Sequence, residues 1–360
     1  MGKYTKEELS LIWLDSFIGL EYKHKKQLYK RIESAPSIKA FIEGSKEYIE
    51  KEIGENQYRT LLSSANQVYL DFILEGLVSR GISVLTIFSE NYPKRLLETD
   101  LPPLVLYCIG DKALLNTQCI SIVGSRRSLP SQISHAKNFT ESIINAGFTI
   151  VTGIAEGVDS AVINSALDSN GKVISVVAGG FDNLYPASNK DLLNKVIKSG
   201  LAITENAPEV VPKPYHFPIR NRIIAGLSDA TLIVSAGIKS GTMYTAEYAE
   251  DYGRYLFVIP YSIGVASGEG CNDLIKRGAM LVDKPQDVLD IFGKTEVNEK
   301  VVLDQQESSI LQLLKEGSLH IEIISSKLNI PIFSLNATLS MLEIKGLVVK
   351  DGYNIYGLKR

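Results

Sequence analysis

Cysteine and histidine are scarce in this 360-residue sequence, which holds three cysteines and four histidines. Cys108, Cys119 and Cys271 are odd in number and far apart, and the first two lie in apolar runs typical of buried strands. No pair of cysteines or histidines has the spacing of a metal site. The sequence therefore argues against a disulfide-stabilised secreted scaffold, and we expect no metal or other cofactor.

Long apolar runs are also missing, since none approaches the roughly 18 residues that a membrane-spanning helix needs. The opening residues, MGKYTKEELS, lack the apolar stretch of a signal peptide. We therefore expect a cytoplasmic protein that does not engage a membrane.

A large excess of charge is absent as well, because the formal net charge is only −3. This value argues against a protein that coats nucleic acid with its whole surface, although it allows a local basic groove. Two stretches without acidic residues, 112–140 and 210–228, contain cations that such a groove would need. They are Lys112, Arg126, Arg127 and Lys137 in the first stretch, and Lys213, Arg220 and Arg222 in the second.

Short apolar runs alternate with helical stretches over the middle of the chain. The runs predicted as strands are 119–124, 148–153, 172–180, 201–205, 230–237 and 255–260. Their nearly continuous apolar character is typical of strands that are buried on both faces. The alternation predicts an α/β domain over residues 79–294, with a Rossmann-like, mostly parallel sheet and right-handed crossovers.

The flanking segments have other patterns. Residues 1–78 indicate short helices and are predicted to form a helical domain of the SAM or helix-hairpin-helix kind. Residues 295–307 are charged and are predicted to be a linker. Residues 308–360 predict a winged helix, with Asp351-Gly352 at the turn of its hairpin. A winged helix contacts either nucleic acid or another protein, and both interpretations remain open.

Candidate ligand-binding residues follow the predicted strands, because ligands of open parallel sheets bind beyond the carboxyl ends of the strands. Gly124 permits a sharp turn, Ser125 can donate to a phosphate, and Arg126 suits a bidentate phosphate contact. An ordinary surface arginine is the alternative for Arg126. Further along, Tyr185 either meets a base or simply packs, and Lys190 is a candidate phosphate ligand.

The stretch KPYHFPIRNRIIAGLSD concentrates aromatic residues and cations at a predicted helix start. Aromatic rings beside cations suit base stacking next to a phosphate contact. The candidates in this stretch are His216, Phe217, Arg220, Asn221 and Arg222. Residues two apart on a helix point in different directions, so both arginines need not serve one ligand. The alternative for Arg222 is a buried ion pair with Asp229.

A third loop, AGIKSGTMYTAE, opens another predicted helix. Its residues Lys239, Ser240, Gly241 and Thr242 form a suitable anion site at the helix N-terminus. No GxSxG, HExxH or complete P-loop pattern occurs in the sequence. The loops offer donors and cations rather than a nucleophile with its base, which predicts a binding protein and not an enzyme.

Together these loops resemble the DprA/Smf family of DNA-processing proteins over about residues 85–290. The matching runs are IVGSRRS, TGIAEGVDSAVINSAL, VVAGGFDNLYPASNKDL, HFPIRNRIIAGLSDATLIVSAG and KSGTMYTAEYAEDYGRYLFVIPY. The sequence departs from the family's usual pattern at three positions. Ile219 stands where the family usually has a cation, Ser235 where it often has an acid, and Glu156 where it has a cation.

The resemblance implies a protein that binds and protects single-stranded DNA and loads the RecA recombinase during natural transformation. It also implies a homodimer formed through the Rossmann-like domain. Arg126 corresponds to the arginine of the family's GSR motif, and Arg220 and Arg222 correspond to those of its RNR motif. Lys239 matches the lysine of the SGT loop, and Lys190 falls where the family often has a DNA-contacting lysine.

Two other functions are compatible with parts of the sequence. Lysine-decarboxylase-like nucleotide hydrolases share this predicted fold, and Glu247 at the end of SGTMYTAE has an offset similar to their catalytic glutamate. A protein-interaction scaffold that recruits a recombinase is the second alternative. Release of a base from nucleotide monophosphates would identify the hydrolase. A variant defective in DNA binding that still recruits the recombinase would identify the scaffold.

Overall fold

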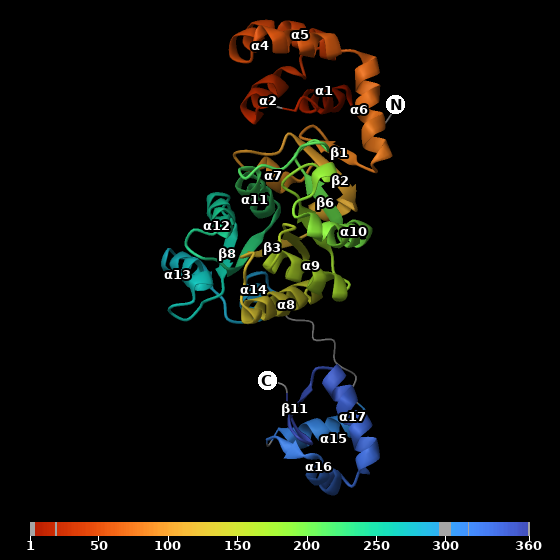
Figure 1. Cartoon of the computed structure of the whole chain (residues 1–360), viewed down its shortest axis with the longest axis vertical. Coiled ribbons are helices and arrows are strands. Elements are labelled where there is room, and N and C mark those ends of the chain that lie inside the picture. Colours follow the sequence, from red (N-terminus) through yellow and green to blue (C-terminus); the bar gives the residue numbers. More distant parts are fainter. Residues whose placement is uncertain (1–3, 19, 295–303, 316, 359–360) are drawn as a thin grey trace. The chain divides into compact units, whose positions relative to one another are not determined.

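The computed structural model describes residues 4–18, 20–294, 304–315 and 317–358. The chain comprises two compact units, residues 1–296 and residues 297–360. Figure 1 shows a helical part of the first unit in red and orange beside an α/β part in yellow, green and cyan. Within the described residues, every helix is too short or too polar to cross a bilayer.

A nine-stranded sheet forms the centre of the first unit, in the order β1-β2-β6-β5-β4-β3-β7-β8-β9. From β6 to β9 along this order all neighbours are parallel, whereas β1 and β2 extend one edge by antiparallel pairing. The mostly parallel sheet predicted from the sequence is confirmed. The strands are β1 (Ser83–Thr86), β2 (Val105–Gly110), β3 (Cys119–Gly124), β4 (Thr149–Thr152), β5 (Val173–Val176), β6 (Leu201–Thr204), β7 (Ala230–Ser235), β8 (Tyr255–Val258) and β9 (Met280–Leu281).

The strand β3 shows why the central strands are apolar on both sides. Ile120 and Ile122 pack into the core on one face of the sheet, and Cys119 packs into the core on the other face. The buried hydroxyl of Ser121 donates to Thr231 Oγ1 of the neighbouring β7 at 2.7 Å, so this polar group keeps a partner. Polar side chains at every second position of this strand would lack hydrogen-bond partners, because helices cover both faces of the sheet.

Helices on both faces bury this sheet. Four of them share one core, namely α8 (Pro130–Asn145), α9 (Val158–Asp168), α10 (Lys190–Ser199) and α14 (Pro285–Ile291). The opposite core contains α7 (Lys94–Leu97), α11 (His216–Leu227), α12 (Thr242–Asp251) and α13 (Glu269–Lys276). The strand order reverses between β3 and β7, which opens a crevice at the carboxyl ends of these strands.

The predicted N-terminal helices are present and pack against the antiparallel edge of the sheet. Their apolar residues, including Trp13, share one core with Val84 of β1 and Val105 of β2. Tyr107 of β2 also donates its hydroxyl to the Asp15 carboxylate at 2.8 Å. The helices are α1 (Lys6–Asp15), α2 (Tyr22–Leu28), α3 (Ile38–Gly44), α4 (Lys46–Glu52), α5 (Glu55–Ser64) and α6 (Gln67–Ser79). Short 3-10 helices in the first unit are η1 (Tyr29–Arg31), η2 (Lys112–Asn116), η3 (Phe181–Asn183), η4 (Ala187–Asn189) and η5 (Ala266–Gly268).

The second unit is the predicted winged helix. It contains α15 (Gln305–Leu314), β10 (Leu319–His320), α16 (Ile321–Leu328), α17 (Ile332–Ile344), β11 (Val348–Gly352) and β12 (Ile355–Leu358), with its strands in the order β10-β12-β11. Residues 295–303 of the predicted linker lie outside the described residues. The linker prediction extends too far, because Asp304 caps α15 in a capping box with Glu307 and residues 305–307 form its first turn.

The hairpin turn of the wing is displaced from its predicted position. Strand β11 continues through Gly352, which pairs with Ile355, so the turn consists of Tyr353 and Asn354. Asn354 has a φ of 55°, a left-handed conformation that asparagine adopts more readily than most residues. The prediction of the turn at Asp351-Gly352 is therefore wrong by two residues, because Asn354 supplies the left-handed position of the turn.

Candidate functional site

A cavity of about 350 Å³ lies in the crevice where the strand order reverses. It is bounded by the carboxyl end of β3, the loop after β4 and the first turns of α11 and α12. The lining residues are Val123, Gly124, Arg126, Ala155, Asp159, Phe217, Pro218, Arg220, Asn221, Ile224, Ser240, Gly241, Thr242 and Thr245. The three separate loops singled out in the sequence therefore meet at one site.

The turn after β3 is tightly packed, and this packing directs Arg126 outward. A Cβ at Gly124 would lie 2.6 Å from Val158 Cγ2, and a Cβ at Gly157 would lie 2.4 Å from the Arg126 carbonyl oxygen. Gly157 also has a φ of +80°. Glycine at both positions lets the start of α9 pack against the turn. The exposed Arg126 guanidinium carbon then lies 5.1 Å from the centre of the Phe217 ring.

Ser125 has a structural contact instead of a place in the lining of the cavity. Its backbone N–H donates to Ser235 Oγ at 3.1 Å, and its hydroxyl donates to the Ser235 carbonyl at 3.3 Å. Ser128 Oγ lies 3.0 Å from Ser235 Oγ and completes this cluster. Ser235 thus ties the turn after β3 to β7.

The floor of the cavity holds a buried cation beside a buried carboxyl group. Arg220 is 6% exposed, donates to the Val176 carbonyl and donates from Nε to Asn221 Oδ1 at 3.1 Å. Burial lowers the pKa of Arg220 to about 10, and nearby Asp159 opposes this shift. Burial raises the pKa of Asp159, while Arg220 lowers it. Because the pKa of Arg220 is still above neutral pH, its guanidinium stays charged, and its burial leaves little water to screen this charge.

Gly153 lets these two charged groups approach the end of β4. A Cβ at this position would lie 2.4 Å from Asp159 Oδ2 and 2.9 Å from Arg220 Nη2. The Ala155 N–H also donates to Asp159 Oδ2 at 3.2 Å. Asp159 is not among the candidate residues that the sequence indicated. The glycine at the strand end and the acid in the next turn were the signal of a buried charge.

The first turn of α12 supplies the opposite wall. Ser240 Oγ accepts from the Thr242 N–H at 3.2 Å and contacts Thr242 Oγ1 at 3.0 Å. Asn221 Nδ2 donates to the Gly241 carbonyl at 3.2 Å, which links α11 to α12 across the cavity. The positive end of the α12 helix dipole favours an anion at this wall.

A smaller hollow of about 60 Å³ adjoins the cavity and shares Arg126, Phe217 and Arg220 with it. The Tyr185 ring meets the Phe217 ring edge-to-face, with their centres 5.5 Å apart, and Tyr185 is 52% exposed. The exposed Glu156 also lines this hollow and accepts from Ser188 Oγ at 3.2 Å. Two aromatic rings, two arginines and one carboxylate thus line the same small hollow.

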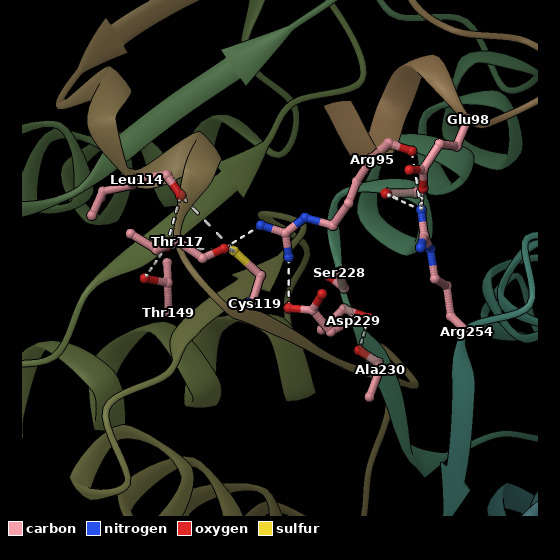
Figure 2. Close-up of polar contacts among 12 residues, drawn as sticks. Arg95, Glu98, Leu114, Thr117, Cys119, Thr149, Ser228, Asp229, Ala230 and Arg254 are labelled. Atoms are coloured by element: carbon pink, nitrogen blue, oxygen red, sulfur yellow. Dashed lines mark hydrogen bonds and ion pairs between the residues drawn. The ribbon is translucent and has the colours of Figure 1, made fainter. Parts of the chain in front are cut away.

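Arg222 does not belong to either cavity, so its expected contribution to the site needs correction. Its side chain is 3% exposed and forms an ion pair with Glu205. The alternative of a buried ion pair is right in kind, although the partner is not Asp229. Asp229 instead pairs with Arg95, with 2.6 Å between Asp229 Oδ2 and Arg95 Nη1. Figure 2 shows this pair near the start of β3 and β7. Successive helical residues turn by about 100°, so Arg220 and Arg222 point to nearly opposite sides.

Three other candidates lie outside the lining of both cavities. Lys190 is the exposed first residue of α10, and Lys239 is exposed just before α12. His216 Nδ1 accepts from the Lys213 N–H at 3.1 Å, and burial together with Lys213 lowers the pKa of this imidazole. His216 therefore stabilises the start of α11.

The three cysteine thiols are buried, and burial disfavours their reactive thiolate form. Burial raises the pKa of the Cys108 and Cys271 thiols to about 12, and Cys119 is also shifted upward by burial. No cluster of His, Cys, Asp and Glu side chains suited to a metal ion occurs in the described part of the chain. Glu247, the hydrolase candidate, is exposed on α12 and lies outside both cavities.

Comparison with known proteins agrees with these features. Residues 83–293 match the family model of DNA recombination-mediator protein A, and residues 295–351 match the DprA winged helix domain. The DNA processing protein DprA of Bacillus subtilis is 34% identical over 219 residues, which is 61% of this chain and 74% of the relative.

Two solved structures resemble the chain as well. DprA of Streptococcus pneumoniae matches with a TM-score of 0.61 and 29% identity, covering 80% of this chain and 98% of that one. DprA of Helicobacter pylori, described for its single-stranded DNA binding mode, matches with a TM-score of 0.54 and 31% identity, covering 59% and 95%. With its matching sheet domain and winged helix, the chain belongs to the DNA recombination-mediator protein A family, also called DprA/Smf.

Proposed function

We propose that this chain binds single-stranded DNA in the cavity between β3, α11 and α12, and that it does so without catalysing a reaction. The observation that carries the proposal is the convergence of Arg126, Phe217, Arg220 and the first turn of α12 around one cavity. The Helicobacter pylori relative, described by its single-stranded DNA binding mode, supports the same ligand.

The two kinds of group in the site match the two parts of a nucleotide. Arg126 and the N-terminus of α12 suit phosphate oxygens, because they offer a planar cation and the positive end of a helix dipole. The rings of Phe217 and Tyr185 suit the faces of bases, which stack on aromatic side chains in single strands only. A duplex hides these faces within its own base stack, so the site favours single strands with little dependence on sequence.

The biological role follows from this ligand and from the family. We propose that the protein acts in the cytoplasm, where it protects incoming single strands and loads the RecA recombinase during natural transformation. We further propose a homodimer formed through the α/β part of the first unit. The edge strand β9 supports this proposal, because Met280 and Leu281 are exposed along it and an open strand edge favours pairing.

Fluorescence anisotropy with single-stranded and double-stranded oligonucleotides at several salt concentrations tests the ligand. We expect preference for single strands and a salt slope of about −0.7 per phosphate neutralised. Arg126→Ala should weaken binding and flatten this slope, whereas Arg277→Ala should change neither. Arg277 is a matched control because it is a partly exposed arginine outside both cavities. Equal affinity for both DNA forms, or an unchanged slope in Arg126→Ala, would exclude this site.

A further inference from the structure

Helix α11 presents two nearly opposite faces, and one of them lines the larger cavity. Arg220 and Asn221 belong to that face, and Asn221 connects it to α12 through the Gly241 carbonyl. Arg222 leaves the helix on the other side and lines neither cavity. The back face of α11 therefore holds a buried cation that makes no contact with a ligand in the cavity.

Groups from two other parts of the first unit hold this cation. Arg222 forms its ion pair with Glu205, which directly follows β6, and the two side chains are 4% and 16% exposed. The Arg222 guanidinium carbon also lies 5.9 Å from the centre of the Tyr22 ring, at the start of α2. The Tyr22 hydroxyl donates to the Pro102 carbonyl at 2.8 Å. One arginine thus joins α11 to the sheet and to the N-terminal helices.

We propose that Arg222, held by Glu205 and Tyr22, is a positioning residue that fixes the orientation of α11. This orientation determines how well Arg220 and Asn221 bind single-stranded DNA. The inference rests on the proposed function of the cavity and adds a role for the N-terminal helices, which contact the back face of α11 through Tyr22.

The physical reason is the cost of burying an unpaired charge. If Glu205 loses its charge, Arg222 stays buried without a counterion, and the helix gains by turning this side chain toward water. Any rotation of α11 also moves Arg220 and Asn221, because all three residues lie within one turn of a rigid helix. The hydrogen bond from Asn221 to Gly241 then weakens as well. Arg222 touches no phosphate, so the number of counterions released on binding stays the same.

Glu205→Gln tests the proposal, with Asp229→Asn as the matched control. Both variants replace the acid of an ion pair in the first unit by its amide. The Arg95–Asp229 pair, however, lies at the opposite ends of β3 and β7 from the cavity (Figure 2). We expect Glu205→Gln to weaken single-strand binding by about tenfold with an unchanged salt slope. Asp229→Asn should lower the melting temperature and leave affinity within about twofold.

A second variant and a second readout keep the result interpretable. Tyr22→Leu removes the ring and hydroxyl but keeps an apolar side chain, and it should weaken binding by about threefold at an unchanged slope. Amide hydrogen exchange in the DNA-free proteins should be faster over residues 216–221 in Glu205→Gln, and unchanged there in Asp229→Asn.

The outcomes separate the two proposals. Unchanged exchange and affinity in Glu205→Gln overturn the positioning role, as does a flattened salt slope, which would mean that Arg222 meets phosphate directly. Equal losses of affinity in Glu205→Gln and Asp229→Asn also overturn it, because stability alone would then explain both. Faster exchange over 216–221 in a protein that fails to bind single strands supports the positioning of α11 and rejects the proposed ligand.

Discussion

Helix α11 of the first unit and helix α17 of the second unit differ in the side chains that they offer to a ligand. The first turns of α11 provide Phe217, Arg220 and Asn221 to a cavity. Helix α17 occupies the position of a recognition helix in a winged helix, yet it exposes apolar side chains. Phe333 is 91% exposed and Ile344 is 79% exposed. The two helices thus have opposite chemistry at the surfaces where contact is expected.

The cation nearest to α17 does not change this contrast. Lys345 follows the helix and pairs with the buried Glu307 carboxylate of α15 at 2.5 Å, so its charge is engaged inside the unit. Affinity for nucleic acid depends largely on cations that meet phosphates. A fold associated with DNA binding is therefore not sufficient for DNA affinity, and we expect this affinity to reside in the first unit.

The largest expected effect on DNA affinity comes from removing the guanidinium group of Arg220, the buried cation of α11 that lines the cavity. Arg220→Met deletes a cavity-lining guanidinium and leaves the Asp159 carboxyl group buried without its neighbouring cation. We expect a loss of about 2 kcal/mol of binding free energy, which is roughly 30-fold in affinity. Anisotropy at constant salt measures this loss. Arg277→Met is the control, and a loss below about twofold in Arg220→Met would contradict a role of the first turns of α11 in binding.

A smaller effect of opposite sign is expected at Glu156. Glu156 lines the small hollow together with Arg126, Arg220 and the two aromatic rings, so we expect its negative charge to repel a phosphate there. Glu156→Arg, which reverses the charge of this side chain, should strengthen binding about tenfold and steepen the salt slope by about 0.7. Glu247→Arg is the matched control, because Glu247 is an exposed acid outside both cavities. Similar gains in both variants would mean that total charge alone controls affinity.

The sequence predicted the sheet and the convergence of the loops, because these features depend on local patterns. The apolar run 119–124 matches β3, and Gly124 with Arg126 follows a rule for the ends of parallel strands. The partner of Arg222 could not be predicted in the same way. Nearest acids in the sequence suggest Asp229, whereas tertiary packing brings in Glu205 from the end of β6. Long-range charge pairs depend on packing between elements, which local patterns do not report.

The pH dependence of stability tests whether the first turn of α11 is a packed element. Burial and Lys213 lower the pKa of His216 below its ordinary value near 6.5. The folded state therefore binds this proton less readily than the unfolded state. Neutral His216 therefore contributes to the free energy of unfolding above about pH 6.5, and this contribution is lost as the pH falls through the pKa of His216 in the folded state. His216→Asn keeps an acceptor for the Lys213 N–H and does not titrate.

We therefore expect the melting temperature of the wild type to fall more than that of His216→Asn between about pH 7.5 and pH 5. The difference should be about one or two degrees. Differential scanning fluorimetry at both values measures it, and the remaining histidines cancel because both proteins contain them. Parallel decreases in the two proteins would mean that His216 is solvated in the same way before and after unfolding.

The smallest effect on DNA affinity is expected from the exposed face of α17. Phe333→Ser and Ile344→Ser replace exposed apolar side chains outside the core of the second unit, so the fold should survive. Because neither side chain offers a cation or a base-edge donor, single-strand affinity should change by less than about twofold. A loss comparable with that of Arg220→Met would show that α17 stacks on bases through Phe333, and the contrast between the two helices would then be wrong. An unchanged affinity would mean that the exposed apolar face of α17 does not contact DNA. An exposed apolar face of this kind is typical of a surface that binds another protein.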